Sequence, residues 1–184
     1  MVLKRSILKL LIENKTKQFT IREISKILNK DYKNVYDSIQ NLTNSINLDK
    51  RGNASYISYK PILTNDIYQT ETFRKNSINL PLIMRDLDSI KNPFFIAILF
   101  GSYAKNTQTK NSDIDLCIIH NNEIELKNIL NKLAIHPKIE IQSFHHLEFV
   151  QMLKIKEFNI AHEIYEHGII LKNIELYYEV IKLG

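Results

Sequence analysis

The segment 100–116, FGSYAKNTQTKNSDIDL, constrains the fold and chemistry of this chain more than any other stretch. Gly101 and Ser102 follow one apolar run, and a second apolar run begins after Asp115. Asp113 and Asp115 are one residue apart, so on a strand their side chains share a face. Paired carboxylates suit Mg²⁺, which usually takes one or two of them plus substrate phosphates. A Gly-Ser turn lets backbone N–H groups approach those phosphates. The segment therefore predicts a site for a nucleotide and a metal ion.

Composition and length indicate a globular chain outside the membrane. The 184 residues are 44% hydrophobic and 9% aromatic, enough for one good core or two small ones. The N-terminal apolar run is interrupted by Lys9 and has helical periodicity, so we reject a signal peptide. No apolar run has the length of a membrane span. The single cysteine, Cys117, lies inside an apolar strand pattern and predicts a buried thiol in a reducing cytoplasm.

The net charge of +5 is unevenly distributed along the chain. Residues 1–60 contain 12 Lys and Arg against 5 Asp and Glu, a balance of +7. Residues 61–184 contain 13 against 15, a balance of −2. A basic head on a nearly neutral body indicates a module that binds a polyanion.

The first 60 residues predict three short helices and a hairpin. Thr20 and Glu23 have the spacing of a capping box that opens the second helix, with Ile27 among its inward residues. Asp31 is placed to cap the third helix. The hairpin turns at 51–53, between two strands of alternating pattern.

This order of elements resembles a winged helix-turn-helix domain, in which the third helix enters the major groove. The resemblance implies DNA binding through residues 1–60, with Asn34 and Gln40 reading adenine edges and Lys33 meeting phosphate. The full set of implied DNA contacts is Tyr32, Lys33, Asn34, Tyr36, Gln40, Lys50 and Arg51. A docking or dimerisation module is the alternative, and the frequency of dimers among winged helices makes a homodimer an expectation.

The remainder of the chain predicts alternating helices and strands, an α+β class. A linker helix occupies 62–81 and a further helix runs from Pro81 to Ile90. The expected elements after that are strand 94–100, a loop with a short helix, strand 114–119, helix 123–134, strand 138–144, helices 145–157 and 159–166, strand 168–171 and a last helix from Asn173. The predicted domains are 1–61, 62–81 and 82–184.

Gly101-Ser102, ten residues and then Asp113-Ile-Asp115 resemble the signature of the polymerase-β-like nucleotidyltransferases, most closely the minimal ones. The resemblance covers roughly 82–184. It implies a compact αβ core with a small mixed sheet that binds a nucleoside triphosphate, with ATP as the expected one, together with two Mg²⁺ ions. It also implies transfer of a nucleotidyl group to an acceptor.

The same resemblance assigns roles to individual residues. Gly101 and Ser102 would hold the triphosphate, and Asp113 and Asp115 would carry the metals. Glu140 takes the place of the family's third acid, as a metal ligand that also helps to deprotonate the acceptor hydroxyl. Two further residues, Lys105 and Ser112, are implied as nucleotide contacts.

The chain departs from the family pattern in three places. Lys105 and Asn106 stand where Arg and Gly are frequent, so the positive charge stays but the bidentate fork is lost. Asn tolerates left-handed backbone, which predicts that Asn106 replaces the glycine at modest cost. Glu140 is one methylene longer than the commoner Asp.

Plainer interpretations stand beside these roles. Asp113 and Asp115 could mark only a polar strand start, and Glu140 could be an exposed acid on an edge strand. His145 and His146 are adjacent and lack a suitably spaced third ligand, so we expect surface or cap residues. The segment 165–170 is expected to be structural.

Two functions remain open from the sequence. The first is a Mg²⁺-dependent nucleotidyltransferase with a DNA-binding head, whose acceptor is a protein hydroxyl (such as one on a toxin), a small molecule or a nucleic acid end. The second is a DNA-binding regulator whose nucleotidyltransferase-like domain senses nucleotide without catalysis. Three acids crowded on one face repel each other unless metal is bound, which favours the first.

Overall fold

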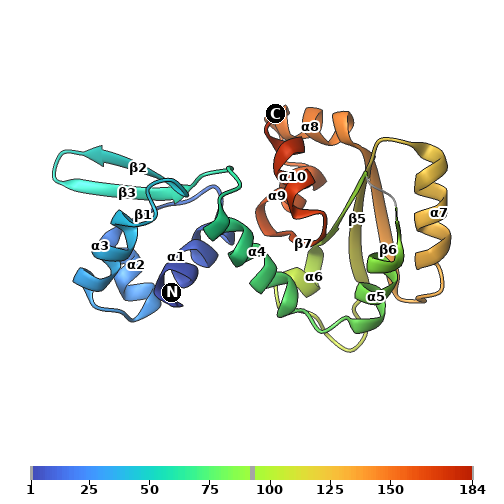
Figure 1. The fold of residues 1–184 in the computed structure, drawn as a ribbon, viewed down its shortest axis with the longest axis horizontal. Helices are drawn as coiled ribbons and strands as arrows, with labels where there is room; N and C mark the ends of the chain where they lie inside the picture. The colour runs from blue at the N-terminus through green and yellow to red at the C-terminus, as the bar shows by residue number, and fades with distance from the viewer. Residues whose placement is uncertain (1, 92–93, 184) are drawn as a thin grey trace. The chain divides into compact units, whose positions relative to one another are not determined.

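The computed structural model describes residues 2–91 and 94–183 and divides into two compact units, Met1–Phe73 and Arg74–Gly184 (Figure 1). The helix α4 (Asn65–Asn76) crosses this division in the chain. The predicted domain limits (1–61, 62–81 and 82–184) remain predictions. Two ends of those ranges, 1 and 184, and two positions within the third, 92–93, lie outside the described residues.

Before α4, the described part of the first unit contains three helices and a three-stranded antiparallel sheet. Its elements are α1 (Val2–Ile12), β1 (Gln18–Thr20), α2 (Ile21–Leu28), α3 (Tyr32–Gln40), β2 (Ile46–Arg51) and β3 (Ala54–Tyr59). The strand order is β1-β3-β2, and β2 and β3 form the predicted hairpin. Fully buried side chains from all three helices and from β3 form its core: Ile7, Leu8, Leu11, Ile12, Ile24, Val35, Ile39 and Ile57.

The predicted helix starts in this unit are confirmed. Thr20 and Glu23 form a complete capping box, in which each side chain accepts a hydrogen bond from the other residue's backbone N–H. The Asp31 carboxylate accepts from two backbone N–H groups at the start of α3. The strand β1 was not predicted, because its three residues are too short for an alternating pattern to be recognised.

The prediction that Ile27 points inward was wrong, because its side chain is 53% exposed. The buried stripe of α2 is made by Ile21 and Ile24. A residue three positions after Ile24 and six after Ile21 lies to one side of that stripe on a helix of 3.6 residues per turn. The helix ends one residue later at Asn29, which adopts the left-handed conformation.

The second unit is a four-stranded mixed sheet with helices around it, as predicted. Beyond α4 its elements are α5 (Pro81–Ser89), β4 (Phe95–Leu99), α6 (Gly101–Ala104), β5 (Ile114–His120), α7 (Glu123–Leu133), β6 (Ile139–His145), α8 (His146–Lys154), α9 (Ile160–His167), β7 (Ile169–Lys172) and α10 (Ile174–Ile181). The strand order is β6-β5-β4-β7. Only the β5–β6 pair is parallel, because α7 connects those two strands as a crossover.

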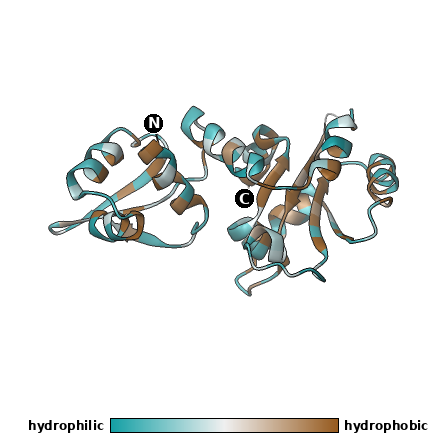
Figure 2. Ribbon diagram, turned by 90° about the horizontal axis from the view of Figure 1, so that it is seen from below, coloured by the Kyte–Doolittle hydropathy of each residue, from teal (hydrophilic) through white to brown (hydrophobic). Residues whose placement is uncertain are grey.

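The two central strands of this sheet carry its core. All five residues of β4 are buried, and β5 is buried from Leu116 onward. Figure 2 shows these strands mostly in hydrophobic colours. Cys117 is fully buried in β5, as predicted, and burial raises the pKa of its thiol far above the ordinary range. The polar start of β5 is therefore accessible, whereas the rest of the strand is buried in the core.

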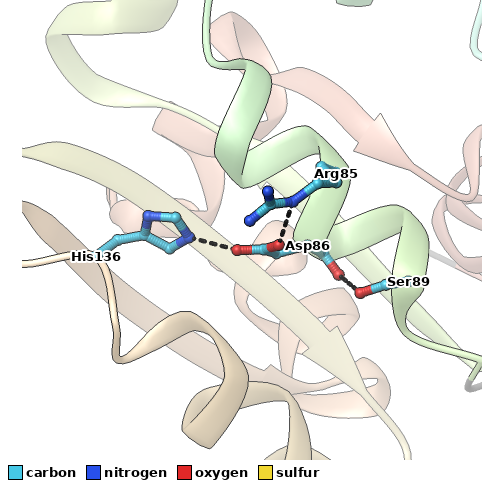
Figure 3. Close-up of polar contacts among 4 residues, drawn as sticks. All are labelled: Arg85, Asp86, Ser89 and His136. Carbon is cyan, nitrogen blue, oxygen red and sulfur yellow. Dashed lines mark hydrogen bonds and ion pairs between the residues drawn. The ribbon is translucent and has the colours of Figure 1, made fainter.

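A polar network ties α5 to the loop after α7 (Figure 3). Asp86 is only 7% exposed. Its carboxylate accepts a hydrogen bond from Arg85 Nε at 3.0 Å and lies 2.9 Å from His136 Nε2. The Ser89 hydroxyl donates to the Asp86 backbone carbonyl at 2.6 Å. The network holds a nearly buried carboxylate in its ionised form.

We expect Asp86→Asn to destabilise the protein near neutral pH and to have little effect in acid. The hydrogen bond from Arg85 and then that from His136 lower the pKa of Asp86, although burial opposes them. A carboxylate with a lowered folded-state pKa stabilises the fold above its unfolded pKa of about 3.9, and this contribution disappears as the pH falls through the folded pKa. Urea denaturation of both proteins at neutral pH and at about pH 3 measures the difference.

The matched control for this experiment is Asp88→Asn on the same helix. Asp88 has a side chain that is 57% exposed and pairs with Lys172 at 3.1 Å. Exposed ion pairs contribute little to stability, so this variant should resemble the wild type at both pH values. A loss from Asp86→Asn that is equally large in acid would contradict the role given to its charge.

Candidate active site

The predicted Gly-Ser turn lies where β4 leaves the sheet. The Phe100 backbone N–H donates to the Asp115 carbonyl at 3.0 Å, which extends the β4–β5 pairing to the first residue of the turn. Gly101 follows with φ +63°, in the left-handed region. A Cβ atom there would lie 2.0 Å from Asp115 Oδ2. The turn therefore requires glycine both for its backbone conformation and for the space that the carboxylate occupies.

The predicted third acid lies directly beside Asp115. In the parallel pairing of β5 and β6, Asp115 is opposite Glu140. Residues in register on neighbouring strands project from the same face of a sheet, and Asp113 lies two residues before Asp115. Glu140 is exposed and its strand β6 is at the edge of the sheet. The structure brings together all three acids that the sequence nominated.

Burial and neighbouring acids disfavour the ionised form of Asp115. The pKa of the Asp115 carboxyl is raised, first by burial and then by the negative charges of Glu140, Glu163 and Asp113. A hydrogen bond from the Ser102 backbone lowers the same pKa and only partly offsets them. A cation placed among these carboxylates would relieve the repulsion, so the donor set fits a divalent metal ion.

The acids do not form a ready-made metal cage. Within residues 2–91 and 94–183, no group of three or more His, Cys, Asp or Glu side chains is arranged to hold a metal ion. Mg²⁺ rarely needs such a cage, since one or two carboxylates and the phosphate oxygens of a substrate complete its shell. The arrangement fits a cation that arrives with a nucleotide.

The segment after the turn contains three more residues that the sequence analysis singled out. Asn106 has φ +58°, which confirms that it takes the left-handed position where related chains use glycine. Lys105 donates from Nζ to Glu163 Oε1 at 2.6 Å, so its charge faces α9. The Ser112 hydroxyl accepts from the Thr109 backbone N–H at 2.9 Å and organises the loop before β5.

Two site residues escaped the sequence analysis. Glu163 joins the acids from α9, 48 residues after Asp115 and outside any recognisable spacing. Arg22, at the start of α2, is the second. The sequence analysis placed Glu163 in a helix over 159–166 without a role, and only the fold shows that α9 lies against α6.

The residues predicted to contact DNA lie on the exposed parts of α3 and of the β2–β3 hairpin. An open groove of about 610 Å³ is lined by Arg22 from α2, by Tyr32 and Tyr36 from α3, and by Arg51 and Ser55 from the hairpin. The other predicted contacts, Lys33, Asn34, Gln40 and Lys50, are exposed on the same elements. Arg51 is held in place by Asp49 at 2.8 Å and lies 5.1 Å from the ring centroid of Tyr56.

The adjacent histidines have the structural role expected of them. His145 is the N-cap of α8 and its Nδ1 accepts from the Leu147 backbone N–H at 3.4 Å. The rings of His145 and His146 lie 4.4 Å apart, at the far end of β6 from Glu140. They are separate from the acids.

Comparison with known proteins identifies the domain that carries the acids. Residues 87–175 match the family described as Polymerase beta, Nucleotidyltransferase. This range contains the glycine turn, the acids and Glu163. Residues 87–175 are therefore similar to nucleotidyltransferase domains. Domains of this family generally use a nucleoside triphosphate and a divalent metal ion.

One relative extends this nucleotidyltransferase match. A protein of Methanocaldococcus jannaschii, whose name proposes a protein adenylyltransferase, is 39% identical over 67 residues. The match covers 36% of this chain and 53% of the relative. The chain thus spans about half the length of that relative.

A solved chain from the crystal structure of a toxin–antitoxin with AMP-PNP is 21% identical, with a TM-score of 0.39. The match covers 57% of this chain and 82% of that chain. Similarity at this level carries no argument about function. Separately, none of the helices in 2–91 and 94–183 combines the length and apolar composition needed to cross a bilayer.

Proposed function

We propose that the protein transfers a nucleotidyl group from ATP to a hydroxyl acceptor. The observation that carries this proposal is the placement of Asp115 between the Gly101 turn and Glu140. The turn at Gly101 and Ser102 holds the triphosphate, with Ser112 and Lys105 nearby as further contacts. Asp113 and Asp115 hold Mg²⁺, and Glu140 contributes the third carboxylate.

The chain's own residues account for positioning and for proton transfer. The acceptor oxygen forms a bond to the α-phosphorus while the bond from that phosphorus to the bridging oxygen breaks, and pyrophosphate leaves. Glu140, exposed at the sheet edge, accepts the proton of the attacking hydroxyl. When bound, two Mg²⁺ ions would supply charge neutralisation at the entering and leaving oxygens.

We propose a protein hydroxyl as the acceptor. The support is the name of the Methanocaldococcus jannaschii relative, which proposes a protein as the substrate. A toxin is one such substrate and remains a prediction from the sequence. A small molecule or a nucleic acid end is the competing acceptor class, and labelling of proteins with α-labelled ATP separates them.

The deciding experiment is calorimetric titration of the purified protein with ATP in the presence and absence of Mg²⁺. We expect metal-dependent binding in the micromolar range, on the order of −8 kcal/mol. No binding of any nucleoside triphosphate with Mg²⁺ would refute the site. Binding without transfer to any acceptor would favour the non-catalytic, nucleotide-sensing regulator.

We further propose that the first unit is a winged helix that binds DNA. Its support is the order of helices and hairpin, the charge balance of +7 in residues 1–60 and the groove between α2, α3 and the hairpin. Arginine and tyrosine side chains line that groove, and such side chains contact phosphate and stack on bases.

We expect Lys33→Ala with Arg51→Ala to weaken DNA binding and to reduce its salt dependence. Each lost phosphate contact lowers the slope of log affinity against log salt by about one, so the double variant should lose about two. Fluorescence anisotropy with a mixed-sequence duplex across a salt series measures this slope. Lys127→Ala with Lys132→Ala on α7 removes the same charge from exposed positions and serves as control. Equal slopes for both variants would exclude this face.

A further inference from the structure

Lys105 and Glu163 form an ion pair that the sequence did not predict. Lys105 follows α6 directly, and Glu163 lies in the first turn of α9. Their Nζ–Oε1 distance of 2.6 Å is that of a charge-assisted hydrogen bond. Both side chains are partly exposed, 40% for Lys105 and 29% for Glu163, so neither is trapped by packing. The pair can therefore open without unfolding the site.

The charges around the pair make its state depend on what the site binds. Glu163 is close enough to Asp115 to disfavour its ionisation, together with Glu140 and Asp113. Lys105 lies four residues after the Gly101 turn, and the Lys105 backbone N–H donates to the Gly101 carbonyl at 3.2 Å. The lysine thus lies beside the proposed triphosphate site but is neutralised by a carboxylate.

We propose that Glu163 holds Lys105 as an internal substitute for phosphate and releases it when a triphosphate binds together with a divalent cation. This proposal rests on the proposed nucleotidyl transfer. Glu163 is accordingly a positioning residue, since it acts through Lys105. Release leaves Glu163 as a fourth carboxylate without its lysine, and only a cation offsets the added repulsion. Binding of nucleotide without metal is therefore disfavoured for two reasons: the lysine is paired with Glu163, and the negative charges of the acids are not neutralised.

The proposal predicts effects of different size in the two binding conditions. Glu163→Gln should tighten binding of metal-free ATP by about fivefold, the equivalent of an exposed ion pair of about 1 kcal/mol. The same variant should change binding of Mg²⁺–ATP by less, so that the ratio of the two affinities shrinks. Isothermal titration of the purified full chain, with EDTA or with Mg²⁺, measures both without relying on turnover.

Two further variants separate ion-pair release from simple charge repulsion. Glu163→Asp keeps the charge but shortens the side chain by one methylene, so it should loosen the pair and still tighten metal-free binding. Glu163→Gln in a Lys105→Met background should tighten metal-free binding clearly less than Glu163→Gln alone, because no lysine remains to be released and only the loss of repulsion is left. Glu166→Gln, on the same helix, is the matched control for loss of one negative charge and should behave as wild type.

Each result of these titrations either supports or overturns the proposed release of Lys105. Tightening by Glu163→Gln that is undiminished without Lys105, or that Glu166→Gln reproduces, would show a general field effect and overturn the proposal. Unchanged metal-free affinity in both Glu163 variants would also overturn it. Failure of every protein, wild type included, to bind ATP with Mg²⁺ would refute the proposed function and this inference with it. Wild-type binding with no effect at Glu163 would refute the inference alone.

Discussion

We expect replacement of Asp113 and Asp115 together by Asn to remove Mg²⁺-dependent binding of ATP and to lower nucleotidyl transfer by about a thousandfold or more. Loss of a single stabiliser of transition-state charge costs 10²–10³ in rate, and this variant removes two. Asn keeps the shape of both side chains but cannot bring negative charge to the metal. Titration with Mg²⁺–ATP and release of pyrophosphate measure the two effects.

DNA affinity is an internal control for the double variant of Asp113 and Asp115. The two carboxylates lie in residues 87–175, while the residues proposed to bind DNA lie before 60, so DNA affinity should not change. Neutralising Asp115 should not destabilise the fold, because the pKa of this carboxyl is raised by burial and by its acidic neighbours. Unchanged ATP affinity would show that these acids are not the metal ligands.

Gly101→Ala should reduce transfer by about a hundredfold while the protein remains folded. The alanine Cβ would lie 2.0 Å from Asp115 Oδ2, so the carboxylate must move. Displacement of a reacting group by about 1 Å costs on the order of 10²-fold in rate. The left-handed backbone adds about 1–2 kcal/mol of strain for any residue with a Cβ. Kinetics with Mg²⁺–ATP and thermal unfolding separate these two costs.

Gly52→Ala is the control for backbone strain alone. Gly52 has φ +58°, nearly the value at Gly101, but a Cβ there meets no atom within 4 Å. Both variants should therefore lose similar stability, whereas only Gly101→Ala should lose transfer. Equal activity in the two variants would mean that the contact with Asp115 has no part in catalysis.

Local sequence patterns predicted most of the second unit because its signals are short-range. The strand at Asp115 is an apolar run with a polar start, and the strand at Glu140 alternates between apolar and polar residues. Their parallel direction follows from the α7 crossover. The capping box at Thr20 and the cap at Asp31 were readable for the same reason, since each joins residues no more than three apart. Asn106 was identified as left-handed from its residue type and from the glycine that is frequent at this place in the pattern the segment resembles.

The parts that the sequence did not predict depend on contacts between distant segments. Glu163 reaches the acids only because α9 packs against α6, and helical periodicity cannot reveal which polar residue of a helix faces a partner. Arg22 belongs to the groove only because the hairpin folds back over α2 and α3. The exposure of Ile27 is decided by which side of α2 the core covers.

The acids of this site are spaced by main-chain hydrogen bonds, since Asp115 and Glu140 are paired residues of one parallel ladder. A ladder of this kind has the same repeat whatever side chains it carries. The helices that cover the sheet can therefore diverge over evolutionary time, keeping only their apolar stripes, while the distance between the two carboxylates is inherited unchanged. Such a site tolerates amino-acid substitutions at most surrounding positions, but hardly any substitution at the glycine beside it.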